Sequence, residues 1–263
     1  MRFTALAVLA LFGTLPANQT LLLSGTTLDY GEVPDSPSLS GLNQLTTECW
    51  MYPLPDTGAS NGIEVTIAQY SSFLGDGPFA MSYYRGIQRM RPIVNWGFPG
   101  TTWFDGNTPV LPGEWTHVAM THDGSMLRLY VNGVLDSQRT ALGPIGESAI
   151  PIRIGAQAGS STNHLTGLLD DVRMWNVART GAEIASSMFG LAPGDDEGLV
   201  GHWEMEDAPA AGVVADSSSF GNDGTLHSMA RVLSSDVDPA SVRPKARLGY
   251  KRRPRGKGDP LVP

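Results

Sequence analysis

Two tryptophans, Trp96 and Trp103, are the side chains best suited to ligand chemistry, because they lie close together among polar neighbours and outside the tryptophan positions that the strand pattern repeats. Aromatic faces stack on sugar rings, and hydroxyl, amide and guanidinium groups beside them bind sugar hydroxyls. The nearby side chains that could do this are Tyr84, Arg85, Asp105 and Asn107. We predict a ligand-binding surface here. The alternative is that Trp96 fills the core and Trp103 shields a loop.

Two clusters of oxygen-bearing side chains could hold calcium, which takes oxygen ligands from loops. Asp170 and Asp171 lie on one strand, and a Ser/Gly-rich turn carries Asp216, Asn222 and Asp223. The alternative is that these side chains cap turns through backbone amides, with Asp171 fixed in a structural hydrogen bond. Calcium is the only cofactor that the sequence suggests.

The chain lacks the residue patterns that mark zinc sites, serine hydrolases and nucleotide-binding enzymes. His117 and His122 flank a turn without the paired spacing that zinc requires, and we expect His117 to be structural. The chain has no Gly-x-Ser-x-Gly elbow and no glycine-rich phosphate loop before a helix. The acidic run of Glu204, Glu206 and Asp207 does not have the carboxylate spacing of a glucanase site, and a solvated strand end explains it better. We therefore predict neither enzyme activity nor a nucleic-acid partner.

The elements that must position these residues are short strands. Residues 113–135 predict two strands around a His-Asp-Gly-Ser turn and then a hairpin, because the Asn132-Gly133 pair supplies the positive φ of a type I′ turn. Further strands fill the gaps between turn-rich clusters, at residues 62–69, 79–85, 90–96, 150–154 and 168–175. A capping box of Thr180 and Glu183 predicts one short helix near 180–189. The fold class is therefore all-β, with antiparallel strands.

Composition divides the chain into a body and two ends. The 263 residues are 41% hydrophobic, enough for one large core. Residues 1–17 place Arg2 before an apolar run and predict a secretory signal peptide, the alternative being a first strand. Residues 233–263 predict a disordered basic tail, which could touch an anionic surface or be a solvated extension. The eight basic residues and one acid of 241–263 leave about −15 of formal charge on the rest of a chain whose net charge is −8.

Cys49 is the only cysteine, which excludes an intrachain disulfide. Alternation places it on the same side of a strand as Leu45, Thr47 and Met51. We predict a small buried hydrophobe, since no local signature offers the base that a catalytic thiol needs.

Several separated motifs resemble the laminin-G-like, concanavalin A-like jelly-roll family. They are Gly-Glu-Trp-Thr-His-Val-Ala at 113–119, Leu-Tyr-Val-Asn-Gly-Val-Leu at 129–135, the segment 167–184, and Gly-Leu-Val-Gly-His-Trp-Glu-Met at 198–205. Segments 28–39, 49–53 and 216–226 extend the resemblance over residues 20–232. It implies a jelly-roll sandwich of two antiparallel sheets with a pentraxin-like layout, an extracellular location, and a binding or adhesion role. Glucanases of similar fold carry a Glu-x-Asp-x-x-Glu strand motif, which this chain lacks.

The tryptophans within the alternating strands, Trp50, Trp115, Trp175 and Trp203, are expected between the two sheets. Together these features favour a secreted or periplasmic, non-catalytic module whose partner is a carbohydrate or an extracellular protein. One alternative is a structural or surface-interaction protein without a sugar site. A less favoured one is a glycoside hydrolase of the same fold.

Overall fold

A computed structural model describes residues 19–25, 29–55, 62–71, 76–95, 100–158, 160, 163–205, 212–227 and 230–234. The predicted signal peptide and residues 235–263 of the predicted tail lie outside these ranges, as does Trp96. The strand that includes residue 232 runs on to Ser234, two residues past the predicted domain boundary. Among the described residues, no helix has the length and apolar character needed to cross a membrane.

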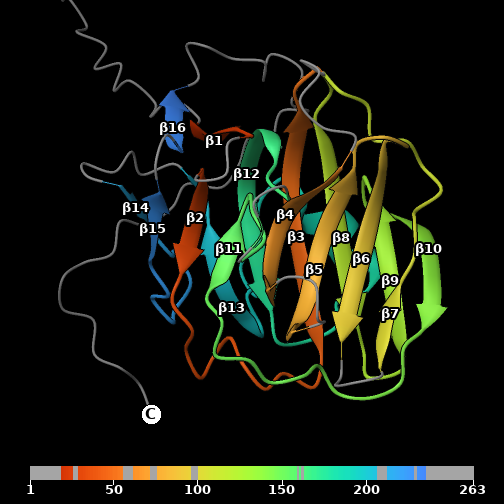
Figure 1. Cartoon of the computed structure of the whole chain (residues 1–263). Coiled ribbons are helices and arrows are strands. Elements are labelled where there is room, and N and C mark those ends of the chain that lie inside the picture. The colour runs from red at the N-terminus through yellow and green to blue at the C-terminus, as the bar shows by residue number, and fades with distance from the viewer. Residues whose placement is uncertain are drawn as a thin grey trace, which may run out of the picture.

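The described chain forms two antiparallel sheets stacked as a sandwich, as the sequence predicted (Figure 1). Sheet I has the order β10-β9-β8-β3-β12-β1-β16, with β13 pairing on β12. Its strands are β1 Gln19–Ser24, β3 Leu45–Pro53, β8 Thr116–His122, β9 Met126–Val131, β10 Val134–Thr140, β12 Thr166–Trp175, β13 Leu199–Trp203 and β16 Arg231–Ser234. Sheet II has the order β14-β15-β2-β11-β4-β5-β6-β7. Its strands are β2 Tyr30–Val33, β4 Ile63–Ser71, β5 Asp76–Tyr84, β6 Arg89–Asn95, β7 Thr101–Trp103, β11 Ile152–Ile154, β14 Val213–Val214 and β15 Gly224–His227.

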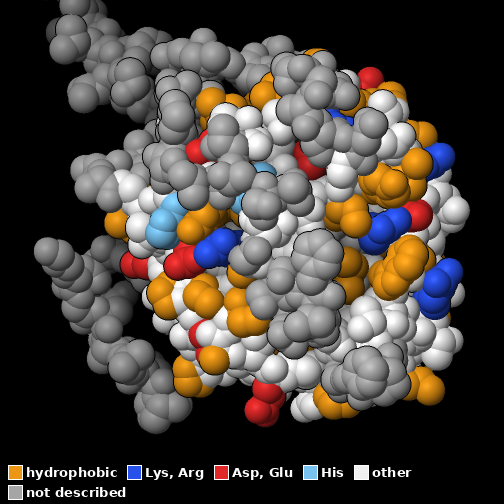
Figure 2. All heavy atoms as spheres, in the orientation of Figure 1, with side chains coloured by type: hydrophobic (Ala, Val, Ile, Leu, Met, Phe, Trp, Pro, Cys, Tyr) orange, Lys and Arg blue, Asp and Glu red, His pale blue; other side chains and the backbone are white. Residues whose placement is uncertain are grey.

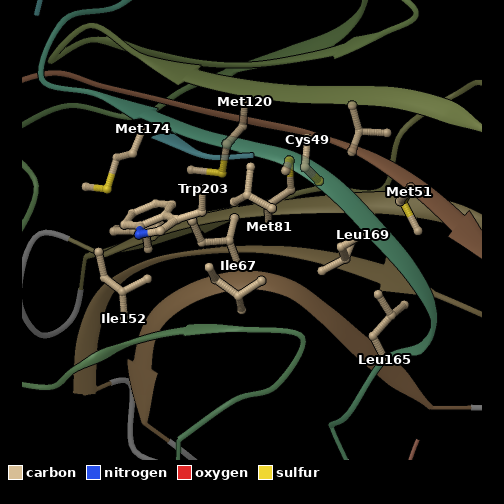
Figure 3. Packing of buried hydrophobic residues seen from close by; sticks show 14 of the residues in the cluster. Cys49, Met51, Ile67, Met81, Met120, Ile152, Leu165, Leu169, Met174 and Trp203 are labelled. Atoms are coloured by element: carbon tan, nitrogen blue, oxygen red, sulfur yellow. The ribbon is translucent and has the colours of Figure 1, made fainter. Parts of the chain in front are cut away.

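The core between the sheets comes from one side of each strand. In β3, Leu45, Cys49 and Met51 are fully buried, and Met81 and Ile67 face them from sheet II. Figure 3 shows Cys49, Met51, Ile67 and Met81 in one apolar layer. Burial raises the pKa of the Cys49 thiol well above its usual range. The prediction of an inert, buried cysteine is therefore confirmed.

The predicted hairpin is confirmed at Asn132-Gly133, where both residues have positive φ, 50° and 75°. Val131 and Val134 pair directly across this turn. A side chain at Gly133 would also meet Ala185 of the helix at 2.9 Å. The turn therefore needs glycine both for its conformation and for the close approach of the helix.

The one described helix, α1 Gly181–Ser187, lies where the capping box predicted it. The backbone N–H of Glu183 donates to the Thr180 hydroxyl, and the Glu183 carboxylate accepts from the Thr180 N–H at 2.6 Å. Ile184 is fully buried against Ala119 and Tyr130 on the outer face of sheet I. The helix thus adds a third layer to the sandwich.

That third layer corrects the expected position of three tryptophans. Only Trp203 belongs to the cluster between the sheets (Figure 3). Trp50 and Trp115 pack with Leu168 on the outer face of sheet I, and the Trp50 indole donates to the Met188 carbonyl at 2.7 Å. Trp175 lies on the same face, under the guanidinium of Arg179 at 4.4 Å from the ring centroid. The expectation was wrong for these three rings because it assumed that a buried ring must lie between the sheets, and the sequence did not show that the outer face of sheet I is covered as well.

Candidate functional site

Four side chains form a small cluster on the outer face of sheet II, and we call Tyr84, Arg91, Trp103 and Asp105 the Trp103 platform. Along β6, Met90, Pro92 and Val94 point into the core, so Arg91 and its alternate neighbours point outward. Register places Arg91 opposite Ser82 of β5, and Ile93 opposite Trp103 of β7. Three adjacent strands therefore bring the four side chains to one place.

Arg91 lies at the centre of the platform. Its guanidinium is 4.9 Å from the Tyr84 ring centroid and 4.5 Å from the Trp103 ring centroid, both cation–π distances. Arg91 Nε and Nη2 donate to the two carboxylate oxygens of Asp105, at 2.7 and 3.0 Å. The bidentate pair and the two rings fix the guanidinium before any ligand arrives.

Trp103 is the exposed member, with 48% of its surface open to solvent. It sits on β7, the edge strand of sheet II, and its carbonyl accepts a hydrogen bond from Arg139 of β10 at 2.9 Å. The exposed part of the Trp103 ring is an apolar surface in contact with solvent. In Figure 2 basic side chains lie among hydrophobic ones toward the right-hand side of this face.

The loop after β7 is fastened to β10 through Asn107. Its backbone N–H donates to a carboxylate oxygen of Asp136 at 2.7 Å, and its side-chain amide donates to the Asp136 carbonyl at 3.0 Å. Burial opposes the Asp136 charge, but hydrogen bonds from Thr108, Asn107 and Ser137 lower the pKa of the Asp136 carboxyl. Asn107 is exposed and its amide holds the loop that carries Asp105.

The structure brings Tyr84, Trp103 and Asp105 together, and it places Arg85 elsewhere. Arg85 is 7% exposed, and its Nη2 pairs with Glu64 at 2.9 Å. Its other donors reach the carbonyls of Leu54, at 2.8 Å, and of Thr166, at 3.0 Å. This guanidinium ties strand ends together inside the protein. Sequence reasoning missed Arg91, although alternation along β6 was a signal that could have found it.

The platform can bind but has a single carboxylate. Glycoside hydrolysis uses two carboxyl groups flanking the scissile bond, about 5 to 10 Å apart. Asp105 is the one carboxylate in contact with Arg91 at this place, and both of its oxygens accept from that guanidinium. The arrangement suits stacking and hydrogen bonding rather than bond cleavage.

The aspartates predicted for calcium lie in two groups that His202 connects. The Asp171 carboxylate accepts from Arg173 Nε at 2.8 Å and lies 2.7 Å from the His202 ring. Asp170 is 1% exposed in β12. The Asp216 carboxylate accepts from the backbone N–H of His202, Ser218 and Asn222, at 2.7 to 2.8 Å.

The rest of that turn is also hydrogen-bonded within the chain. Asp223 accepts from the Asp216 N–H at 2.8 Å, and the Asn222 amide donates to the Val200 carbonyl at 2.8 Å. In the part of the chain that the structure describes, no three His, Cys, Asp or Glu side chains form a group able to hold a metal ion. Calcium binding stays a prediction.

A buried charged network lies beneath α1. Glu48 is fully buried and pairs with Arg173 at 2.9 Å and with Arg179 at 3.5 Å. Burial opposes the charge of Arg173, but Asp171 and Glu48 outweigh it and raise the Arg173 pKa. His117 is 4.0 Å from Glu48 and 1% exposed. This network joins β3, β12 and the helix, and its burial gives it a structural role.

The remaining candidates occupy ordinary structural positions. His122 is fully buried, its ring nitrogen is 3.0 Å from the Ala141 carbonyl, and burial lowers its pKa. Glu204 lies 3.1 Å from the His202 ring. Glu206 and Asp207 lie outside the described residues.

Comparison with known proteins identifies chains that are similar in sequence or in structure. Mouse pappalysin-1 is 36% identical over 90 residues, which are 33% of this chain and 6% of that protein. A Bacteroides ovatus protein described as a candidate carbohydrate-binding protein superposes with a TM-score of 0.64 at 18% identity, over 84% of this chain and 60% of that one. The heptameric SAP-like pentraxin of Limulus polyphemus gives a TM-score of 0.51 at 16% identity, over 68% of this chain and 86% of that one.

The chain spans less than two thirds of the length of the first two proteins, and the two structural likenesses concern the fold alone. A laminin-G family model, described as the concanavalin A-like lectin/glucanases superfamily, matches residues 25–185. That segment is more than half of the chain and carries most of both sheets, most of the helix and the whole Trp103 platform. The family match and the two-sheet architecture agree, and this chain belongs to the concanavalin A-like lectin/glucanase superfamily.

Proposed function

We propose that this chain is a secreted, non-catalytic module that binds carbohydrate through the Trp103 platform. The observation that carries the proposal is the half-exposed Trp103 ring, held beside Arg91 and Asp105 on a sheet face. Such a group offers an apolar surface for a sugar ring and charged hydrogen-bonding groups for its hydroxyls. The carbohydrate-binding description of the Bacteroides relative supports a sugar as the ligand class.

The test is glycan binding by the full chain and by Trp103→Ala. We expect the affinity to fall about tenfold or more, because an aromatic contact worth about 1.5 kcal/mol corresponds to that factor. Trp103→Phe should retain part of the binding. The matched control is Phe220→Ala, which removes another exposed aromatic ring, 53% open to solvent, from a turn elsewhere in the sequence.

Unchanged binding by Trp103→Ala, with an unchanged urea unfolding midpoint, would refute the platform as the site. Equal losses in the Trp103 and Phe220 variants would point to a general effect of aromatic removal instead.

A second candidate is adhesion to an extracellular protein, favoured by exposed apolar side chains on the edge strand β10 and two residues beyond its end. Val134 is 69% exposed, Leu135 47% and Leu142 64%. Exposed apolar residues on an edge strand suit a protein partner. Under this candidate Leu142→Ser weakens partner capture and Trp103→Ala leaves it unchanged, whereas a sugar-binding module shows the reverse pattern.

A further inference from the structure

The basic residues are unevenly distributed along the sequence. All three lysines lie in the C-terminal segment 241–263, so the sandwich uses arginine for its basic side chains. Arg85, Arg173 and Arg179 are buried and paired with carboxylates. These guanidinium groups are neutralised inside the fold and cannot meet a ligand.

The Trp103 platform, by contrast, has more arginines than carboxylates around it. Arg89, on β6, lies opposite Tyr84 of β5. It is two residues before Arg91 and on the same outer face. Arg139 lies at the other end, with its Nη1 2.9 Å from the Trp103 carbonyl. Within the described residues neither Arg89 nor Arg139 forms an ion pair, while Arg91 shares Asp105.

The neighbouring carboxylate, that of Asp136, offsets part of this positive charge, but it forms no ion pair with an arginine among the described residues. Asp136 precedes Arg139 by three residues on β10, but its oxygens accept from the backbone N–H groups of Asn107 and Thr108. Arg89 also has one buried nitrogen, Nη1, without a hydrogen-bond partner among the described groups. Because that nitrogen is buried, the rest of the Arg89 guanidinium, on a partly exposed side chain, is the part that can meet an oxygen-rich anion.

We infer that the Trp103 platform selects an acidic glycan, one whose sugars carry carboxylate or sulfate groups. The inference rests on the proposed carbohydrate function and names its ligand class. The sugar ring covers Trp103, while the anionic groups pair with Arg139 at one end and Arg89 at the other. Carboxylate and sulfate both match the planar fork of a guanidinium.

The spacing favours a chain of several sugars over a single one. Arg89 is four residues from Ile93, the partner of Trp103 across β6 and β7, which at about 3.3 Å per residue is about 13 Å along the strand. Repulsion from the acidic remainder of the protein directs such an anion to this region.

The experiment compares glycans that differ only in charge. The probes are an oligouronate and its carboxyl-reduced neutral counterpart, and a sulfated oligosaccharide and its desulfated form. We expect the charged member of at least one pair to bind at least about fivefold more tightly, with an affinity that falls as salt rises. Which pair shows the difference identifies the anion.

Variants assign the effect to residues. Arg89→Gln and Arg139→Gln should each weaken binding of the charged glycan about fivefold and leave the neutral glycan unchanged. The control is Arg128→Gln, which removes an arginine that is already paired with Asp123 at 2.6 Å.

Equal binding of charged and neutral glycans, together with loss of both in Trp103→Ala, overturns this inference and keeps the proposed function. Preference for charged glycans that survives in the Arg89 and Arg139 variants also overturns it. If no glycan of either kind binds the folded protein, the proposed function fails as well.

Discussion

Arg91 and Arg173 both pair with carboxylates, but the two pairs differ in their exposure to solvent and therefore in their roles. The side chains of Arg91 and Asp105 are 14% and 34% exposed, whereas those of Arg173 and Glu48 are 2% and 0% exposed. A pair that is partly open to water is worth little to stability. A buried pair must stay intact, because breaking it leaves a charge without water or a partner.

Glu48→Gln should therefore destabilise the protein strongly. It removes the carboxylate that Arg173 and Arg179 share, and we expect the free energy of unfolding to fall by about 3 to 5 kcal/mol in urea denaturation. Arg128→Gln, which breaks an exposed pair with Asp123, should cost less than about 1 kcal/mol. Similar losses in both variants would contradict the structural role of the buried network.

At the scale of single elements, local signals fix turns and caps that then position whole strands. The turn between β8 and β9 depends on Asp123, whose carboxylate accepts from the backbone N–H of Ser125 at 2.9 Å and of Met126 at 2.8 Å. Arg128 donates to the same carboxylate at 2.6 Å. Burial opposes the charge, but these hydrogen bonds hold the pKa of Asp123 far below its usual range.

This shift predicts an acid-dependent loss of stability. Because the folded pKa of Asp123 lies below the unfolded value of about 3.9, its contribution is complete above that value and is lost as the pH falls toward the folded pKa. Asp123→Asn should unfold more easily at pH 7. Its unfolding free energy should then decline less than that of the wild type between about pH 5 and pH 2. Parallel pH profiles of the two proteins would show that Asp123 is not responsible.

At the scale of the whole molecule, the two outer faces differ. The outer face of sheet I is covered by α1 and by Met188 and Phe189, which pack on Trp50 and Leu168. The outer face of sheet II carries the Trp103 platform at its β5–β7 end, whose strands are labelled in Figure 1. The Trp103 platform and the buried Glu48 network therefore lie on opposite outer sides of the sandwich.

Calcium can be tested on the intact molecule. A metal that binds only the folded state raises its melting temperature, by an amount that grows with concentration. Calcium at this turn would have to displace hydrogen bonds that the Asp216 carboxylate accepts from the chain, so equal melting temperatures in calcium and in chelator would contradict the calcium prediction. A higher melting temperature in calcium that is lost in Asp216→Asn would instead locate an ion at this turn.

Much of this architecture could be predicted from the sequence, because alternation, Asn132-Gly133 and the Thr180 capping box are local signals. The third layer could not, because covering the outer face of sheet I depends on contacts between segments far apart in the chain. The same dependence on distant contacts explains which site residues could be identified from the sequence. Tyr84, Trp103 and Asp105 were recognisable by type, whereas the role of Arg91 depends on the register of three strands.

The platform has one half-exposed indole, that of Trp103, beside Arg91 on β6 and Tyr84 on β5. It therefore presents a small contact area. Under the proposed function, a contact of this size gives weak, rapidly reversible attachment at a single point. Firm retention on a repetitive polymer then requires several copies held together, so that each detachment is followed by rebinding nearby. In that setting avidity, rather than intrinsic affinity, determines how long the protein stays on its target.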